Sequence, residues 1–357
     1  MTREHVLTRP STLPVGDAAA RLGAERRRRG RRRGFVVGVL AVALVLVFLV
    51  TLSVGNTFYS PVEVVRVILG EQVPGASFTV GTLRLPRAIT GLLAGVAFGL
   101  AGVTFQTMLR NALASPDVIG ITSGASAAAV LAITVLGLGG AGVSVLAVVC
   151  GLATALAIYL LAYRNGLSGA RLILIGIGVG AMLDSVVSYL LLKSSSFEVQ
   201  AAMRWLTGSL GSAFWDGVPP LAISLLVLVP AILLLTRRLT AMQLGDDSAT
   251  ALGVRVDRTR LLLIVVAVAL AGVATATTGP IAFVAFLSGP IAARLVGGGR
   301  SLLLPAGLVG GLLVLTADLL GQFAFDPSFP VGIVPGAIGA PYLLYLLIRS
   351  NRSGGSL

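Results

Sequence analysis

The stretch "GFVVGVLAVALVLVFLVTLSVG" (residues 34–55) has no charged side chain along its whole length. A helix of about 20 residues is long enough to cross the hydrocarbon core of a bilayer, which is about 30 Å thick. The stretch is apolar on every side and does not alternate with polar residues, so it does not have the pattern of a barrel strand. It predicts a transmembrane helix.

The rest of the chain repeats this signal. Of its 357 residues, 56% are hydrophobic and 11% are charged, and the mean hydropathy is +0.96. So much apolar sequence cannot hide in one soluble core. We expect an all-α polytopic membrane protein, with a membrane domain over 34–350 and a short cytoplasmic tail over 351–357. The candidate spans are 34–55, 88–108, 118–137, 142–162, 172–192, 219–235, 261–279, 280–296, 302–321 and 331–348.

The net charge of +13 has one main source, the run "RRRRGRRR" (26–33) directly before the first span. Arginines beside a first span favour its cytoplasmic orientation and attract anionic lipid headgroups. We interpret the run as an orientation signal rather than a nucleic-acid-binding tail. Residues 1–33 lack an apolar period and are expected to be disordered.

Arginines in the later connections also indicate the topology. With a cytoplasmic N-terminus, most of them fall in cytoplasmic connections, as the positive-inside rule requires. Ten spans then place both termini in the cytoplasm. The weakest boundary is at Gly279 and Pro280, where the chain must reverse almost without a loop; Gly and Pro are suited to such a break.

The scarcity of reactive residues excludes several chemistries. Cys150 is the only cysteine and His5 the only histidine, so a metal site and a Ser/His/Asp triad lack their usual residues. Lys193 is the only lysine, and its context is not a phosphate-binding GxxxxGK[ST] loop. We therefore expect no catalytic residue, metal or cofactor in this chain. If ATP and Mg²⁺ are used, a partner subunit binds them.

Polar residues are rare inside the spans. The second span has a stripe of glycines at intervals of three or four residues, which is typical of close helix packing. Gln106 is a polar side chain deep in the same span, and a candidate for the translocation path. Asp184 and Asp318 are too few and too far apart for a typical ion-coupled carrier, and hydrogen bonding to a neighbouring helix is the favoured interpretation.

The segment "TRRLTAMQLGDDSATALGVRVDRTR" (236–260) is the longest cytoplasmic connection. Asp246 and Asp247 can stabilise the start of a short helix, which Gly253 ends. A capped helix under the membrane could bind a partner protein. A plain solvated connector fits the spacing equally well.

Seven motifs in fixed order resemble one family over roughly residues 55–350, namely the permease subunits of type II ABC importers for iron-siderophore complexes, haem and vitamin B12. The motifs are "LRLPR" at 83, "RNALASPDVIGITSGAS" at 110, "WLTGSL" at 205, "LGDDSATALGV" at 244, "GPIAFVAF" at 279, "ADLLG" at 317 and "PVGIVPGAIGAPYLLYLL" at 330.

The resemblance implies a ten-span permease that works as a dimer, with the translocation path between protomers. It implies that Arg84 and Arg87 dock an extracytoplasmic substrate-binding protein. Two cytoplasmic ABC ATPase subunits would press on the coupling segment at about 244–254. The coupling residues would be Asp246, Asp247, Ala249, Leu252 and Gly253. In "WLTGSL", Gly208 and Ser209 join Gln106 as candidates for the path.

The chain departs from the family pattern at a few positions. Gln322 stands where the family often has an arginine, and Ser328 where it often has a glutamate. The third docking charge is therefore absent here, or supplied by a different second permease. Ala112 replaces a usual proline, and "GPIAAR" (289–294) differs from the family's form of that motif.

These features together predict a permease of an ABC importer in the bacterial cytoplasmic membrane. The expected cargo is a ferric siderophore, with vitamin B12 or haem as the alternative. A secondary carrier is the rival from another class. The expected partners are the ATPase subunits, the binding protein, membrane lipid and a second permease protomer, identical or paralogous; no nucleic acid is expected.

Overall fold

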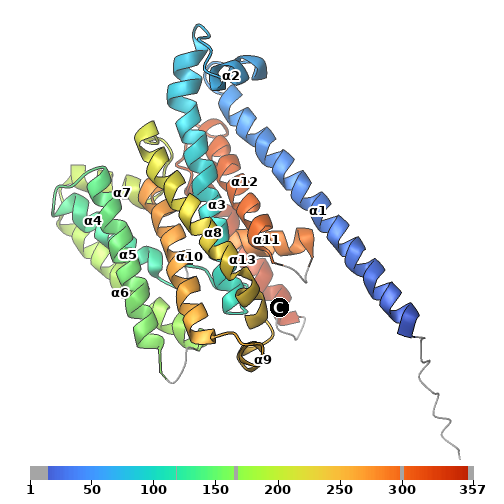
Figure 1. The fold of residues 1–357 in the computed structure, drawn as a ribbon. Coiled ribbons are helices and arrows are strands. Elements are labelled where there is room, and N and C mark those ends of the chain that lie inside the picture. Colours follow the sequence, from blue (N-terminus) through green and yellow to red (C-terminus); the bar gives the residue numbers. More distant parts are fainter. Residues whose placement is uncertain (1–14, 118, 165–167, 298–300, 353–357) are drawn as a thin grey trace, which may run out of the picture.

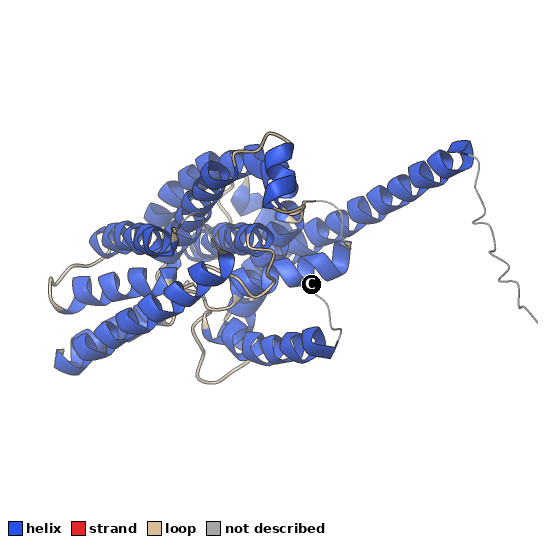
Figure 2. Cartoon of the chain, turned by 90° about the horizontal axis from the view of Figure 1, so that it is seen from below, coloured by secondary structure: helices blue, strands red, loops and turns tan. Residues whose placement is uncertain are grey.

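The computed structural model describes residues 15–117, 119–164, 168–297 and 301–352, and within these ranges it is helical and has no strand (Figures 1 and 2). The long helices are α1 (Val15–Ser53), α3 (Leu85–Met108), α5 (Ala141–Ala162), α6 (Gly169–Lys193), α8 (Val218–Met242), α10 (Val256–Thr278), α12 (Leu303–Phe323) and α13 (Ile333–Arg352). The shorter ones are α2 (Pro61–Ile68), η1 (Ser77–Arg84), α4 (Ile121–Thr134), α7 (Ser196–Leu206), η2 (Trp215–Gly217), α9 (Asp246–Ala251) and α11 (Val284–Val296).

The predicted all-α membrane fold is confirmed. Seven segments, each one helix or a short helix continuous with a long one, are long and apolar enough to cross a membrane. Three shorter apolar helices, Ile121–Thr134, Val284–Val296 and Ile333–Tyr345, lie at the other three predicted spans. Each of the ten predicted spans therefore corresponds to one helix of the structure.

Helix α3 lies at the centre of the bundle and packs against α12, α10 and α11 (Figure 1). The predicted glycine stripe makes this close approach possible. A methyl group on Gly95 or Gly99 would collide with the backbone of α12 at Gly310 or Ala306, and one on Gly102 with the backbone of α11 at Ala285. Small residues thus bring helix backbones into contact, as in other membrane bundles.

The second span begins earlier than expected. We predicted its start at residue 88, after Arg84 and Arg87, but η1 and α3 form one continuous helical segment from Ser77. Pro86 lies in the first turn of α3, and η1 runs directly into this turn. Proline has no N–H to donate and its ring clashes with the carbonyl group four residues earlier, so an ordinary α-helical turn cannot precede it. The chain adopts wider π turns in η1 and continues. Both arginines therefore project from a helix.

Helix α1 also begins earlier than expected. Residues 1–33 were predicted to be disordered, which is wrong for 15–33, because these residues form the first turns of α1. Arginine is a strong helix former, and an uninterrupted apolar helix follows, so the helix extends through the basic run. Residues 1–14 lie outside the described part of the chain, as does most of the predicted tail over 351–357.

The predicted break near Gly279 is confirmed. Helix α10 ends at Thr278, and Gly279 has a φ of +71°, a conformation that suits glycine. Helix α11 begins only at Val284. Pro280 and Gly279 therefore separate two helices rather than bend one.

Candidate docking and coupling sites

Arg84 ties the end of α1 to η1. Its guanidinium donates to the carbonyl oxygens of Leu52 (2.9 Å), Ser53 (3.0 Å) and Thr57 (2.7 Å). It also lies 5.2 Å from the centre of the Tyr59 ring, within the range of a cation–π contact. All of these partners are neutral, so they hold the side chain in place and leave its positive charge uncompensated.

Arg87 is held differently, by a carboxylate. Its Nε and one terminal nitrogen donate to the two oxygens of Asp318, at 2.9 and 2.7 Å. Asp318 is only 1% exposed, and the Gln322 amide donates to it at 2.8 Å. The expectation that Asp318 is hydrogen-bonded to a neighbouring helix is confirmed, and the pair joins α3 to α12. Asp184, in contrast, is exposed on α6.

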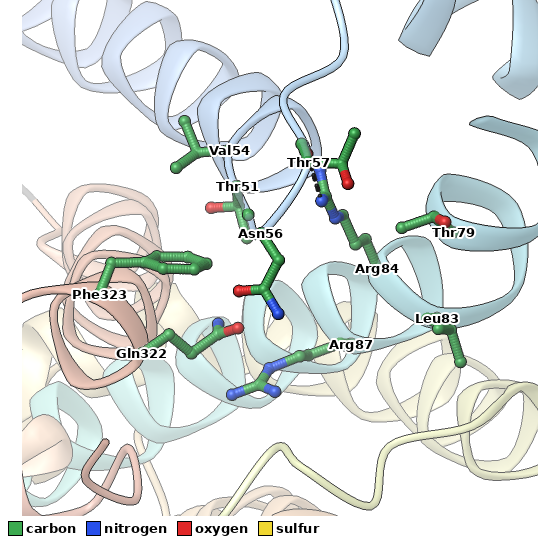
Figure 3. Close-up of a pocket in the computed structure, with 11 residues that line it drawn as sticks. Thr51, Val54, Asn56, Thr57, Thr79, Leu83, Arg84, Arg87, Gln322 and Phe323 are labelled. Atoms are coloured by element: carbon green, nitrogen blue, oxygen red, sulfur yellow. Dashed lines mark hydrogen bonds between the residues drawn. The ribbon is translucent and has the colours of Figure 1, made fainter. Parts of the chain in front are cut away.

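The two arginines lie on the wall of one open cavity of about 260 Å³ (Figure 3). Asn56 and Gln322 face the same space, and the wall is completed by the end of α1, η1 and the end of α12. The exposed charge on this wall is positive. Arg84 has no counter-charge within the part of the chain that the structure describes, and the carboxylate that pairs with Arg87, Asp318, lies behind it rather than on the surface. The cavity suits an anionic group from a partner.

Helix α2 lies next to this region and is independently stabilised. Ser60 and Glu63 form a complete capping box at its first turn. The hydrogen bonds from the Ser60 backbone and hydroxyl hold the pKa of Glu63 below its usual value. Glu63 therefore stays ionised as part of α2.

The coupling segment forms the short helix α9 at the opposite end of the bundle from η1 (Figure 1). The predicted helix and its end at Gly253 are confirmed, with a φ of +81° at Gly253. The sequence suggested that Asp246 caps the helix, but the N-cap residue is Gly245. The Asp246 carboxylate instead accepts from Arg260 of α10, at 3.0 and 3.1 Å.

The faces of α9 differ sharply. Ala249 is fully buried against the bundle, while Asp247 is exposed. Leu252, just after the helix, is 64% exposed, and Leu244, just before it, is 66% exposed. Exposed leucines outside the apolar spans form a surface suited to a protein partner.

The candidate path residues do not line the cavity that contains Arg84 and Arg87. Gln106 is buried and donates to the carbonyl oxygens of Ala112 (3.0 Å) and Phe286 (2.9 Å). Gly208, with a φ of +65°, packs against the Pro280 backbone, and the Ser209 N–H donates to the Thr278 carbonyl at 2.7 Å. Their role in a translocation path stays a prediction.

Sequence reasoning missed two partners in these sites. Tyr59 and Arg260 were not singled out, yet Tyr59 stacks with Arg84 and the largely buried Arg260 holds Asp246. The first contact depends on a loop fold that has no periodic signal. The second joins positions 14 residues apart across a turn at Gly253, so helical spacing could not indicate it.

Comparison with known proteins agrees with these features. Residues 43–349 match the FecCD transport family. The ferric enterobactin transport system permease protein of Escherichia coli is 42% identical over 81% of this chain and 88% of its own length. The achromobactin transport system permease protein of Dickeya dadantii is 43% identical over 88% of this chain and 93% of its own.

A solved structure shows the same architecture. A structure described as an inward-facing conformation of a putative metal-chelate type ABC transporter is 27% identical, with a TM-score of 0.79 over 88% of this chain and 99% of its own. The protein is thus an integral membrane permease subunit of an ABC transporter. It belongs to the FecCD transport family.

Proposed function

We propose that this chain imports a ferric siderophore by alternating access in a bacterial cytoplasmic membrane. The relatives at 42% and 43% identity carry enterobactin and achromobactin in their names, which supports an iron-chelate cargo over vitamin B12 or haem. The observation that carries the proposal is the pairing of a positively charged cavity at one end of the bundle with an exposed short helix at the other.

The cavity end receives an extracytoplasmic binding protein. An acidic side chain on that protein pairs with Arg84, and a second meets the part of the Arg87 guanidinium that Asp318 does not occupy. Exposed charge pairs of this kind set docking register and association rate more than affinity.

The α9 end binds an ATPase subunit, which holds ATP and Mg²⁺. The exposed side chains of Leu244 and Leu252 pack against the ATPase subunit. Movement of α9 is then transmitted to α10 through the ion pair between Asp246 and Arg260. A second permease protomer, identical or paralogous, completes the assembly.

Arg84 allows a direct test of docking. Arg84→Lys keeps the charge but cannot reproduce the fork of bonds to three carbonyl oxygens, whereas Arg84→Gln loses the charge. If docking uses the charge, the Lys variant keeps most of the uptake of an iron-chelate panel and the Gln variant loses most of it. Equal loss in both variants would show that Arg84 acts through local structure alone.

The coupling role is tested by Leu252→Glu. This substitution leaves the Asp246–Arg260 ion pair and the buried Ala249 in place, so the fold is expected to survive. A tagged protein should then recover at least tenfold less ATPase subunit after gentle solubilisation. The matched control is Leu69→Glu, which changes an exposed leucine at the end of α2, also outside the predicted spans. Full recovery with Leu252→Glu would contradict the coupling role.

The same purification examines the assembly. Wild-type protein with a C-terminal tag should copurify with an ATPase subunit and a second permease, and mass spectrometry of the second permease shows whether the dimer is mixed. A lone, stable chain across several detergents would contradict the proposed assembly.

A further inference from the structure

The basic end of α1 is an exposed helix rather than a loose tail. Arg27, Arg28, Arg31 and Arg32 are exposed, and none of them has an ion-pair partner among the described residues. Arg33 points to the bundle instead and donates to the Ser301 carbonyl at 2.7 Å. Figure 2 shows this half of α1 projecting away from the other helices.

The four exposed arginines continue the face of α1 that is not covered by the bundle. At 3.6 residues per turn they fall within an arc of about 140°. The same arc contains the exposed apolar side chains Phe35, Val39, Val42 and Leu46. Leu40 and Leu44, which are buried, share the opposite side with Arg33. The uncovered face of α1 is therefore apolar along the membrane span, where it contacts lipid tails, and basic at the cytoplasmic end of the helix.

The length of α1 puts these arginines at the membrane surface. The apolar part over 34–53 rises about 30 Å at 1.5 Å per residue, which equals the thickness of the hydrocarbon core. The next two turns, with the arginines, then lie in the layer of lipid headgroups. Phosphate groups of lipids next to the helix are thus within reach of the guanidinium groups.

Electrostatics favours an anionic ligand at this point. Arg27 and Arg31, and likewise Arg28 and Arg32, are four residues apart, where like charges on a helix repel one another. An anion between them removes this repulsion, and the guanidinium fork binds phosphate oxygens in pairs.

We propose that Arg27, Arg28, Arg31 and Arg32 form a binding site for the headgroups of anionic phospholipids in the cytoplasmic leaflet. The apolar face next to them holds the acyl chains of the same lipids, which distinguishes this ligand from a soluble acidic protein or a nucleic acid. The site is separate from the cavity at Arg84 and from α9.

The test uses the full-length protein, purified in detergent, delipidated and titrated with phosphatidylglycerol or phosphatidylcholine. Bound lipid is counted by native mass spectrometry. Wild-type protein should prefer phosphatidylglycerol. Replacing all four arginines by Gln should reduce its affinity for phosphatidylglycerol roughly tenfold or more, since each basic residue near a membrane surface adds to the free energy of binding to anionic lipid. Replacing them by Lys should keep most of it.

Two pair variants guard against failed folding of the fourfold variant. Arg28→Gln with Arg32→Gln should lower the affinity for phosphatidylglycerol more than Arg237→Gln with Arg238→Gln, because the latter two exposed arginines at the end of α8 are consecutive and do not form two pairs one turn apart. Equal effects of the two pairs, or unchanged binding in the fourfold Gln variant, would overturn the proposal. So would displacement of the lipid by inorganic phosphate, or tighter binding to duplex DNA than to phosphatidylglycerol vesicles.

Discussion

Asp318 is almost completely enclosed, and Arg87 is its counter-charge. Removing one member of such a pair costs more than the pair itself contributes, because the other charge is left without compensation. Arg87→Ala should therefore destabilise the protein by about 3 kcal/mol or more. Asp318→Asn should cost less, because Arg87 is partly exposed and its charge can reach water. Thermal unfolding in detergent measures both.

A double variant distinguishes the loss of the ion pair from the cost of leaving the Asp318 charge without compensation. Arg87→Met combined with Asp318→Leu removes both charges and should recover a large part of the stability lost in Arg87→Ala. If Arg87→Ala and Asp318→Asn lower the transition temperature equally, the asymmetry argued from burial is incorrect. Neither measurement depends on docking, so the structural role of Arg87 is tested alone.

Gln322 offers a gain-of-function prediction at the same cavity. Its amide lies against Asp318, on the wall that contains Arg84 and Arg87. Gln322→Arg adds a positive charge there and should strengthen binding-protein association up to about fivefold at low salt, the range of an exposed ion pair. The gain should fade at high ionic strength. Surface plasmon resonance at two salt concentrations checks this, and a gain that is insensitive to salt would contradict the electrostatic reason.

The packing of α3 against α12 predicts which glycines tolerate a side chain. Gly99→Ala would place a methyl group on the Ala306 carbonyl, and relief requires the two helices to separate. We expect a loss of about 1–3 kcal/mol, as for other overpacked sites. Gly272→Ala in α10 is the control, because nothing lies within 4 Å of the added methyl group. A control that unfolds as early as Gly99→Ala would exclude a specific clash.

The helices were predictable where one signal dominated. The apolar runs identified the ten spans, and the glycine stripe identified the packing face of α3. Helix starts were less predictable. Pro86 indicated the start of the second span, but the π turns of η1 accommodate this proline and the helix begins earlier. The basic run before the first span was expected to be disordered, although arginine favours helix, and it is part of α1.

The sites were predictable only as positions along the chain. Motifs marked Arg84, Arg87 and Asp246, but their partners come from elements that no local pattern links to them. Arg87 and Asp318 are 231 residues apart, so their pairing follows from the packing of α3 on α12 rather than from sequence spacing. Arg84, Arg87 and Asp246 therefore each have a structural partner that the motif did not indicate.

The arginine distribution predicts the orientation of the whole bundle, and single cysteines can test this prediction. The positive-inside rule predicts that α9 is cytoplasmic and that the connection between α2 and η1 is on the outer side. In a Cys150→Ala background, Gln72→Cys and Ser248→Cys give one exposed thiol at each end. An impermeant maleimide should label Gln72→Cys in intact cells and Ser248→Cys only in inverted vesicles. The reverse pattern would invert the topology, and with it the assignment of the basic cavity to binding-protein docking and of α9 to the ATPase.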